Sequence, residues 1–340
     1  MKAVLMTAPG SPEVLQLQEI PNPLPPQNTE LLVRLKAAGV NPIDTKLRKR
    51  GTFYADKMPA ILGCDGAGVV EAVGTEVKRF RVGDEVYFCN GGIGVSEAMP
   101  KASRQGNYAE FTTVEERFVA HKPQSVSFIE AAAAPLVLIT AWEALYERGR
   151  LEPGEKVLIH AGAGGVGHVA IQLAKLKGAD VCTTISSQEK ADFVKHLGAD
   201  YAINYQQVDF AKAVLDWTNG EGVDLAFDTV GGETFEKTFP AIRIYGDIVT
   251  ILQPSDKTNW KIARQRNLRI GLELMLTPMM QGMVEAQAHH GEILSECAKL
   301  MDEGKLKICV NRTFGLSEVA KAHELLEAGS MMGKLVIVNG

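Results

Sequence analysis

Two hydrophobic patterns divide the chain. Up to about residue 120, short apolar and polar alternations are separated by Gly, Pro and Asn, which is typical of β-strands and turns. From about residue 128 onward, short apolar runs alternate with segments of helical spacing. The expected strands of this second part are KVLIH, DVCTTI, YAIN, VDLAFD, GDIVTIL and LRIGLE. Strands that alternate with helices predict an α/β fold with a parallel, doubly wound sheet.

The first part is expected to form a separate β-rich domain. Residues 66–88 alternate apolar and polar positions around glycines, which indicates barrel-like strands with tight corners. The chain ends in the strand-like KLVIVNG, and a terminal apolar strand needs a partner for its backbone hydrogen bonds. We therefore predict that residues 1–125 plus 306–340 form the β-rich domain and that residues 126–305 form the α/β domain.

Composition agrees with two packed domains and narrows the partners. The 340 residues are 46% hydrophobic and 23% charged, with a net charge of -5 and no sustained basic block. This composition argues against nucleic acid or an anionic membrane as a partner. The start, MKAVLMTAPG, lacks the apolar core of a signal peptide, and the five cysteines form no C-x-x-C pair. We expect a soluble, cytoplasmic protein with free thiols and a small-molecule substrate.

A glycine-rich segment, HAGAGGVGHVAIQLAK at residues 160–175, follows KVLIH directly and opens an amphipathic helix. Its G-x-G-x-x-G pattern therefore has the strand-to-helix context that dinucleotide binding requires. Such glycines permit a tight turn, a close approach of backbone to pyrophosphate, and close packing of helix on strand, while the helix N-terminus attracts the anion. A purely structural turn is the alternative. The residues expected at the phosphates are Gly162, Ala163, Gly164, Gly165, Val166 and Gly167.

The end of the next strand distinguishes between dinucleotides. NAD enzymes usually keep an acidic residue there for the ribose 2′-hydroxyl. This chain has Ser186 and Ser187 in that region and Lys190 in the following helix, although Glu189 stands beside the lysine. Hydroxyls and a cation suit a 2′-phosphate, whose charge a carboxylate would repel. The predicted cofactor is NADPH.

Several segments resemble the medium-chain dehydrogenase/reductase superfamily and, within it, the zeta-crystallin-like quinone oxidoreductases. The segment GEKVLIHAGAGGVGHVAIQLAK is similar to that group's signature. Upstream, AAGVNPIDTKLR, GCDGAGVVEAVG and GDEVYF also match; downstream, LGADYAINY, GVDLAFDTVGG and RTFGLSEVAKAHELLEAGSMMGKLVIV do so. The resemblance implies a GroES-like catalytic domain, an inserted Rossmann domain and a homodimer, often paired through the last Rossmann strand, here LRIGLE.

The resemblance also assigns residues. Asn41, Pro42 and Asp44 would line the nicotinamide side, with Thr140 near the cofactor. Ser186, Lys190 and Tyr205 would surround the adenine ribose phosphate. The residues that would complete the cofactor site are Thr229, Ile251, Gln253 and Lys334.

The chain departs from the zinc alcohol dehydrogenases of the same superfamily. It has GCD in place of G-H-E, so that Cys64 stands where the histidine would be, and Asp44 lies near the position of the first cysteine ligand. A catalytic zinc normally has three protein ligands, which this sequence does not supply. We expect no metal and interpret Cys64 as a buried thiol.

Without zinc, quinones and enones are easier hydride acceptors than simple ketones, because charge on a distant oxygen needs only hydrogen-bond donors or water. We therefore predict an NADPH-dependent reductase that transfers a hydride to quinones or activated enones. The candidate catalytic residues are Asn41, Lys46 and Tyr54. Each also has a structural interpretation: Asn41 as a turn residue, Lys46 as a solvated cation and Tyr54 as a packing residue.

Other functions stay open at this point. An NADPH-dependent 2-enoyl-thioester reductase shares the fold and cofactor, and Arg48, Lys49 and Arg50 offer a basic patch for its substrate unless they form a solvated loop. A crystallin-like or RNA-binding protein with little catalysis is an alternative of another class. A zinc alcohol dehydrogenase is the third alternative. The physiological acceptor, and whether the protein is a dimer or a tetramer, do not follow from the sequence.

Overall fold

The structure is a computed structural model and describes residues 1–54, 58–94 and 105–340. Its contacts divide the chain into two compact units. The first comprises Met1–Leu136 and Leu276–Gly340, and the second comprises Val137–Met275. The first unit therefore includes residues 126–136 and 276–305, and the domain boundaries expected from the sequence pattern stay a prediction.

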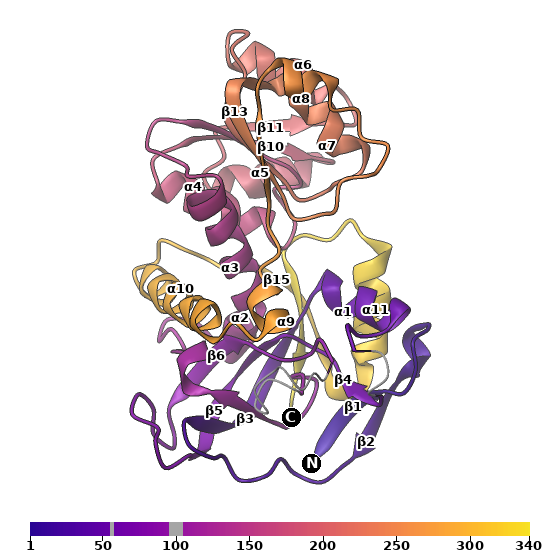
Figure 1. Ribbon diagram of the computed structural model, residues 1–340, viewed down its shortest axis with the longest axis vertical. Coiled ribbons are helices and arrows are strands. Elements are labelled where there is room, and N and C mark those ends of the chain that lie inside the picture. Colours follow the sequence, from indigo (N-terminus) through magenta and orange to yellow (C-terminus); the bar gives the residue numbers. More distant parts are fainter. Residues whose placement is uncertain (55–57, 95–104) are drawn as a thin grey trace. The chain divides into compact units, whose positions relative to one another are not determined.

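The first unit is built mainly from β-strands (Figure 1). These are β1 (Lys2–Met6), β2 (Leu15–Glu19), β3 (Glu30–Val40), β4 (Ala60–Ile61), β5 (Asp65–Val73), β6 (Glu85–Cys89), β7 (Phe111–Glu115), β8 (Val119–His121), β15 (Val310–Gly315) and β16 (Lys334–Val338). Its helices are α1 (Pro42–Arg50), α2 (Phe128–Ala133), α9 (Thr277–Gln281), α10 (Val284–Asp302) and α11 (Val319–Ala328).

The long strand β3 organises this unit. One sheet has the order β15-β16-β3-β5-β6-β8, with β7 also paired to β3, and a smaller sheet has the order β2-β1-β4. Along β3, Leu31, Val33 and Leu35 alternate into a core that also contains Phe88 and Phe118. The predicted return of the C-terminal strand is confirmed, because β16 pairs antiparallel with β3.

The second unit is the predicted doubly wound sheet. Its parallel strands have the order β11-β10-β9-β12-β13-β14. They are β9 (Lys156–Ile159), β10 (Asp180–Ile185), β11 (Tyr201–Asn204), β12 (Val223–Asp228), β13 (Ile242–Thr250) and β14 (Arg269–Leu272). The helices of the unit are α4 (Gly167–Leu176), α5 (Gln188–His196), α6 (Phe210–Trp217), α7 (Glu233–Thr238) and α8 (Lys261–Gln265). The strand order reverses between β9 and β12, which is where ligands bind in such sheets.

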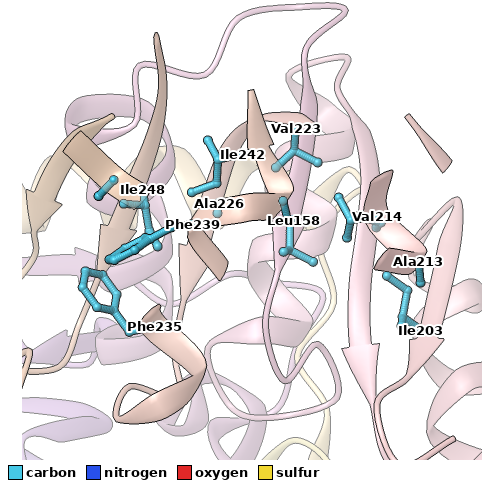
Figure 2. Packing of buried hydrophobic residues seen from close by; sticks show 13 residues of the cluster. Leu158, Ile203, Ala213, Val214, Val223, Ala226, Phe235, Phe239, Ile242 and Ile248 are labelled. Atoms are coloured by element: carbon cyan, nitrogen blue, oxygen red, sulfur yellow. The ribbon is translucent and has the colours of Figure 1, made fainter. Parts of the chain in front are cut away.

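The hydrophobic core of the second unit is formed by buried side chains of its strands and helices, from Leu158 of β9 to Ala263 of α8. Leu158 and Ala226 lie on adjacent strands. Phe235 of α7 and Phe239, which follows the end of α7, pack edge to face with ring centroids 5.0 Å apart (Figure 2). The apolar runs of the sequence thus become buried strands covered by helices.

The segment before β9 is irregular. Helix α3 (Pro135–Trp142) begins at the proline that interrupts the apolar run and continues into a π-helical turn, Glu143–Arg148. Within the described residues, no helix is both long and apolar enough to cross a membrane.

Candidate functional site

The glycine loop of the second unit connects β9 to α4 as predicted. Alanine at Gly167 would place a Cβ 2.4 Å from the carbonyl oxygen of Ala161, so close packing inside the protein explains this glycine. At Gly164 the same construction gives 3.2 Å to that oxygen, a contact that a small shift relieves. The protein's own packing therefore does not require a glycine at position 164, which fits a backbone face that a pyrophosphate approaches.

A cation and a hydroxyl meet at the carboxyl end of β10. The Lys190 ammonium donates to the Ser186 hydroxyl over 3.1 Å, and Ser187 caps α5 by accepting from the backbone N–H of Lys190. Tyr205 follows the neighbouring strand β11, and its backbone N–H donates to Ile185 over 3.2 Å. The Tyr205 side chain is half exposed. The Lys190 ammonium and the Ser186 hydroxyl form a small cradle beside the N-terminus of α5, and this cradle is suited to an anion.

A cavity of about 670 Å³ opens beside this cradle within the second unit. It lies at the carboxyl ends of the strands, where doubly wound sheets bind ligands. Its lining includes His160, Thr184, Tyr205, Phe210, Val230 and Thr234.

His160 at the floor of this cavity is held in one tautomer. Thr238 donates its hydroxyl proton to the carbonyl of Thr234, so this hydroxyl accepts from Nε2–H of His160 over 2.8 Å. Nδ1 of His160 then accepts from the hydroxyl of Thr184. Burial lowers the pKa of His160 to about 4, although the charge of Asp228 opposes this effect. The imidazole is therefore neutral at pH 7 and offers the cavity its ring, since both nitrogens have partners.

Three of the remaining predicted cofactor residues of this unit lie near strand ends, and the fourth lies on a helix. Thr229 follows β12 and donates its hydroxyl to the carbonyl of His160 over 2.7 Å. Ile251 and Gln253 follow β13, the strand paired with β12. Thr140 is buried in α3.

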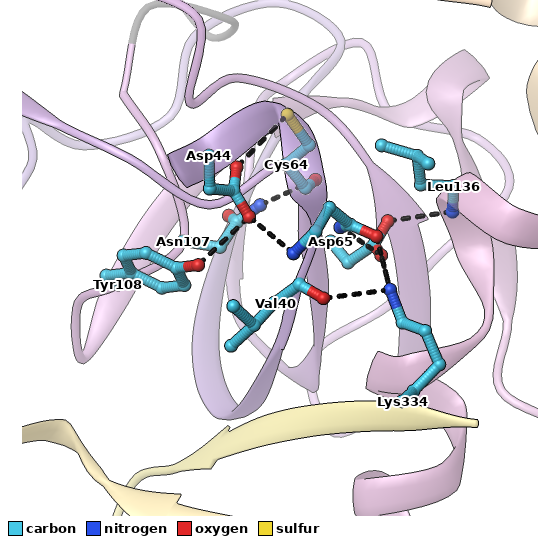
Figure 3. Close-up of polar contacts among 9 residues, drawn as sticks. Val40, Asp44, Cys64, Asp65, Asn107, Tyr108, Leu136 and Lys334 are labelled. Atoms are coloured by element: carbon cyan, nitrogen blue, oxygen red, sulfur yellow. Dashed lines mark hydrogen bonds and ion pairs between the residues drawn. The ribbon is translucent and has the colours of Figure 1, made fainter. Parts of the chain in front are cut away.

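In the first unit, the junction of β3 and α1 is densely polar (Figure 3). The backbone N–H of Asn41 donates to Asp44 over 2.8 Å, and this hydrogen bond caps α1. The side-chain Nδ2 of Asn41 donates to Asp65 over 2.8 Å. The ammonium of Lys334 donates to the carbonyl of Val40 over 3.1 Å and to Oδ1 of Asn41, and lies 3.7 Å from Asp65. All four side chains are buried.

Two residues that sequence reasoning missed extend this network. The hydroxyl of Tyr108 donates to Asp44 over 2.9 Å, and Nε2 of His323 lies 3.3 Å from that hydroxyl. Burial raises the pKa of Asp44 to about 7, and burial together with the charge of Arg48 lowers the pKa of His323 to about 3. Because these residues are far apart in the chain, no local pattern indicates the contact.

The side chains around Cys64 that could bind a metal contact other groups of the protein. The Cys64 thiol lies 3.9 Å from Asp44, and Asp65 accepts from Asn41 and from the backbone N–H of Leu136. In residues 1–54, 58–94 and 105–340, no three His, Cys, Asp or Glu side chains are grouped to hold a metal ion.

The three predicted catalytic residues have separate surroundings. The Asn41 amide faces Asp65 and Lys334 as described above. Lys46 lies on the exposed side of α1, where partial burial and the charge of Arg50 lower its pKa. The Tyr54 hydroxyl donates to the carbonyl of Met280 over 2.9 Å. Their contacts differ, and a shared catalytic role for these three groups stays a prediction.

The basic run after Lys46 lies on α1 and does not form a solvated loop. Arg48 is fully buried and its guanidinium pairs with Glu327 at 2.6 Å. Lys49 pairs with the same carboxylate at 3.3 Å. Arg48 is therefore not part of a basic surface patch for an acyl-CoA, and the charge of Lys49 is already paired with Glu327.

Comparisons with known proteins agree with both units. Residues 27–124 match the alcohol dehydrogenase GroES-like domain family, and residues 197–337 match the zinc-binding dehydrogenase family. A quinone oxidoreductase of Pseudomonas aeruginosa is 33% identical over 340 residues, 99% of each chain. A 2-methylene-furan-3-one reductase of Solanum lycopersicum is 34% identical over 342 residues, 99% of this chain and 79% of the relative. The structure of the Escherichia coli quinone oxidoreductase complexed with NADPH superimposes with a TM-score of 0.85 at 29% identity, covering 99% of this chain and 100% of the other.

The GroES-like unit, the Rossmann unit and the glycine loop together define a medium-chain dehydrogenase/reductase. Within that superfamily, the chain belongs to the quinone oxidoreductase family of NAD(P)-dependent enzymes. The resemblance seen in the sequence motifs is thereby confirmed.

Proposed function

We propose that the protein is an NADPH-dependent reductase that transfers a hydride to quinones or activated enones without zinc. The observation that carries the proposal is the Lys190–Ser186 pair beside the N-terminus of α5. An ammonium, a hydroxyl and the phenol of Tyr205 suit a 2′-phosphate, and the strand end lacks the carboxylate that an NAD ribose requires. The relative crystallised with NADPH supports the same choice.

The remaining residues of the second unit fit a dinucleotide. The loop Gly162, Ala163, Gly164, Gly165, Val166 and Gly167 would hold the pyrophosphate, and Thr140, Thr229, Ile251 and Gln253 would contact the cofactor elsewhere. The cavity lined by His160 and Phe210 would take the adenosine. When bound, the cofactor supplies the hydride. The residues of this chain then orient it, and the family resemblance puts Asn41, Pro42 and Asp44 on its nicotinamide side.

The proposed mechanism needs no metal. The carboxylates of Asp44 and Asp65 and the thiol of Cys64 contact neighbouring protein groups, and among the described residues no three His, Cys, Asp or Glu side chains are grouped to hold a metal ion. Quinones and enones suit such a site because hydrogen-bond donors suffice for their developing charge. The ammonium of Lys46 is a proposed donor, and the hydroxyl of Tyr54 becomes a second one if it releases the carbonyl of Met280. Asn41 is proposed to act on the nicotinamide side of the site.

One relative argues for an enone as the acceptor. It is named a 2-methylene-furan-3-one reductase, and the compound in that name is a conjugated ketone. The burial of Arg48 counts against a long acyl-CoA. The test is NADPH oxidation by metal-free protein with 9,10-phenanthrenequinone, with a small enone and with crotonyl-CoA, each corrected for the rate without protein. Turnover with the quinone or the enone is expected. Turnover with crotonyl-CoA alone would establish the enoyl-thioester alternative, and none with any acceptor would leave a binding role.

We also propose a homodimer formed through β14. This strand lies at the end of the six-stranded sheet, so its outer backbone edge has no partner strand within the described part of the chain. Leu272 and Leu274, at and just beyond its end, are 63% and 50% exposed. A second copy of the chain would pair this edge and cover both side chains.

A further inference from the structure

The amide of Asn41 is oriented by two charged residues. Its Nδ2 donates to a carboxylate oxygen of Asp65 over 2.8 Å, and its Oδ1 accepts from the ammonium of Lys334. An ammonium can only donate and an ionised carboxylate can only accept, so the two partners allow one orientation of the amide. Figure 3 shows Lys334 and Asp65 directed toward one another at this junction.

The ammonium of Lys334 is held by the protein. It donates to the carbonyl of Val40 and to Oδ1 of Asn41, and it forms an ion pair with Oδ2 of Asp65 at 3.7 Å. The side chain is 3% exposed. Burial lowers the pKa of Lys334, and the nearby Asp65 opposes this effect. A direct contact of this ammonium with a ligand would require the side chain to move out of this buried position.

Asp65 connects the pair to a third segment. Its second oxygen, Oδ1, accepts from the backbone N–H of Leu136 over 2.8 Å, at the first turn of α3. The carboxylate therefore joins the β3–α1 junction, the start of β16 and the start of α3. A buried ion pair adds little net stability compared with an apolar replacement of similar volume, so stability alone is a weak explanation for it.

We propose that Lys334 and Asp65 are positioning residues that fix Asn41, and that Lys334 does not bind the cofactor directly. This inference rests on the proposed function, because it assigns the fixed amide to the nicotinamide side of the site. It replaces the direct cofactor contact that the family resemblance implies for Lys334. The Asn41 amide is then the group through which both charges act.

The test compares Lys334→Met with Lys305→Met, a control in which an exposed lysine of a surface ion pair is changed in the same way. Two quantities are measured for each: the Kd for NADPH from fluorescence titration, and kcat with a quinone at saturating NADPH. Lys334→Met is expected to lower kcat about ten- to hundredfold, as loss of a hydrogen bond to a charged group predicts. The Kd should change less than about threefold. In an Asn41→Ala background, Lys334→Met should cause no further loss of kcat.

A second variant covers the case in which Lys334→Met leaves Asp65 unpaired and unfolds the protein. The double change Asp65→Asn with Lys334→Met removes both charges, and we expect it to fold and to keep the low kcat. A wild-type kcat in this folded double variant would overturn the proposal. The proposal would also be overturned if Lys334→Met raised the Kd for NADPH tenfold or more both in the wild-type protein and in Asn41→Ala, since that result identifies a direct contact between Lys334 and the cofactor.

Hydrogen exchange gives a readout that does not depend on turnover. The peptide that contains Val40–Asp44 should lose protection in Lys334→Met and keep it in Lys305→Met. If the peptide loses protection as expected but the wild-type protein reduces no quinone or enone, the positioning of Asn41 is supported and the proposed function is contradicted. Unchanged protection would contradict the positioning itself.

Discussion

The ammonium of Lys190 lies 3.1 Å from the hydroxyl of Ser186, at the carboxyl end of β10. This contact joins two residues that the sequence analysis selected together for the 2′-phosphate, and it orients the cation before any ligand binds. A preorganised cation and hydroxyl recognise a phosphate at a lower entropic cost than flexible groups do.

Replacing Lys190 by alanine should reduce the preference for NADPH. The loss of one charge-assisted hydrogen bond predicts a fall of about ten- to hundredfold in kcat/KM for NADPH. The value for NADH should stay nearly constant, because NADH lacks the 2′-phosphate. Lys195→Ala on the same helix is the matched control. Equal losses with both donors would show that Lys190 does not contact the 2′-phosphate.

Two glycines of the phosphate loop should respond differently to alanine. Gly167→Ala brings its Cβ to 2.4 Å from a backbone oxygen, so overpacking should lower the free energy of unfolding by about 1–3 kcal/mol. Gly164→Ala should unfold at the wild-type urea concentration but bind NADPH about tenfold more weakly, because the methyl group meets the ligand and not the protein. Urea unfolding and fluorescence titration measure the two effects. A destabilised Gly164→Ala with wild-type affinity would contradict the assignment.

Asp44 should make stability depend on pH. Burial raises its pKa from 3.8 to about 7, so the folded chain holds a proton that the unfolded chain releases at lower pH. Its contribution to stability is therefore fully present below about pH 4 and is lost as the pH rises to about 7. Asp44→Asn cannot titrate. Its free energy of unfolding relative to wild type should rise between pH 5 and pH 7 by on the order of 1 kcal/mol per pH unit.

Urea unfolding of both proteins at several pH values checks this difference. The neighbouring Asp65, Lys334 and Tyr108 are present in both chains and are coupled to Asp44, so the difference between the two pH curves reports the titration of Asp44 together with this coupling. Parallel pH curves for the two proteins would mean that Asp44 keeps an ordinary pKa.

The edge of β14 predicts the effect of a charge at Leu272. Leu272→Glu should turn the proposed dimer into a monomer, because a buried carboxylate at a paired edge is costly. Leu24→Glu is the control, since Leu24 is 80% exposed in the first unit. Light scattering after gel filtration gives the masses of both variants and of the wild type. A monomeric wild type, or a dimeric Leu272→Glu, would exclude this edge as the interface.

Much of the fold could be predicted from local patterns. The strand expected at DVCTTI is β10 with the same bounds, and the strand expected at KVLIH contains β9. The glycine loop lies between strand and helix as its spacing requires. These features depend on neighbouring residues, which a sequence displays directly.

The polar network of the first unit could not be predicted in the same way. Tyr108 contacts Asp44 across 64 residues of sequence, and His323 contacts the Tyr108 hydroxyl across 215. Arg48 appears in the sequence as part of a basic run although it is buried against Glu327. The π-helical turn at Glu143–Arg148 likewise has no local signature in this chain. Such contacts are set by the tertiary fold, which periodicity does not encode.

The most direct test of the central claim is the steady-state rate of quinone reduction by the wild-type protein with each donor. The protein would be given 9,10-phenanthrenequinone with NADPH or with NADH, and kcat/KM would be determined for both donors. We predict turnover with a kcat/KM for NADPH at least about tenfold higher, as one charge-assisted contact to the 2′-phosphate requires. Equal or better use of NADH, or no quinone reduction with either donor, would contradict the assignment.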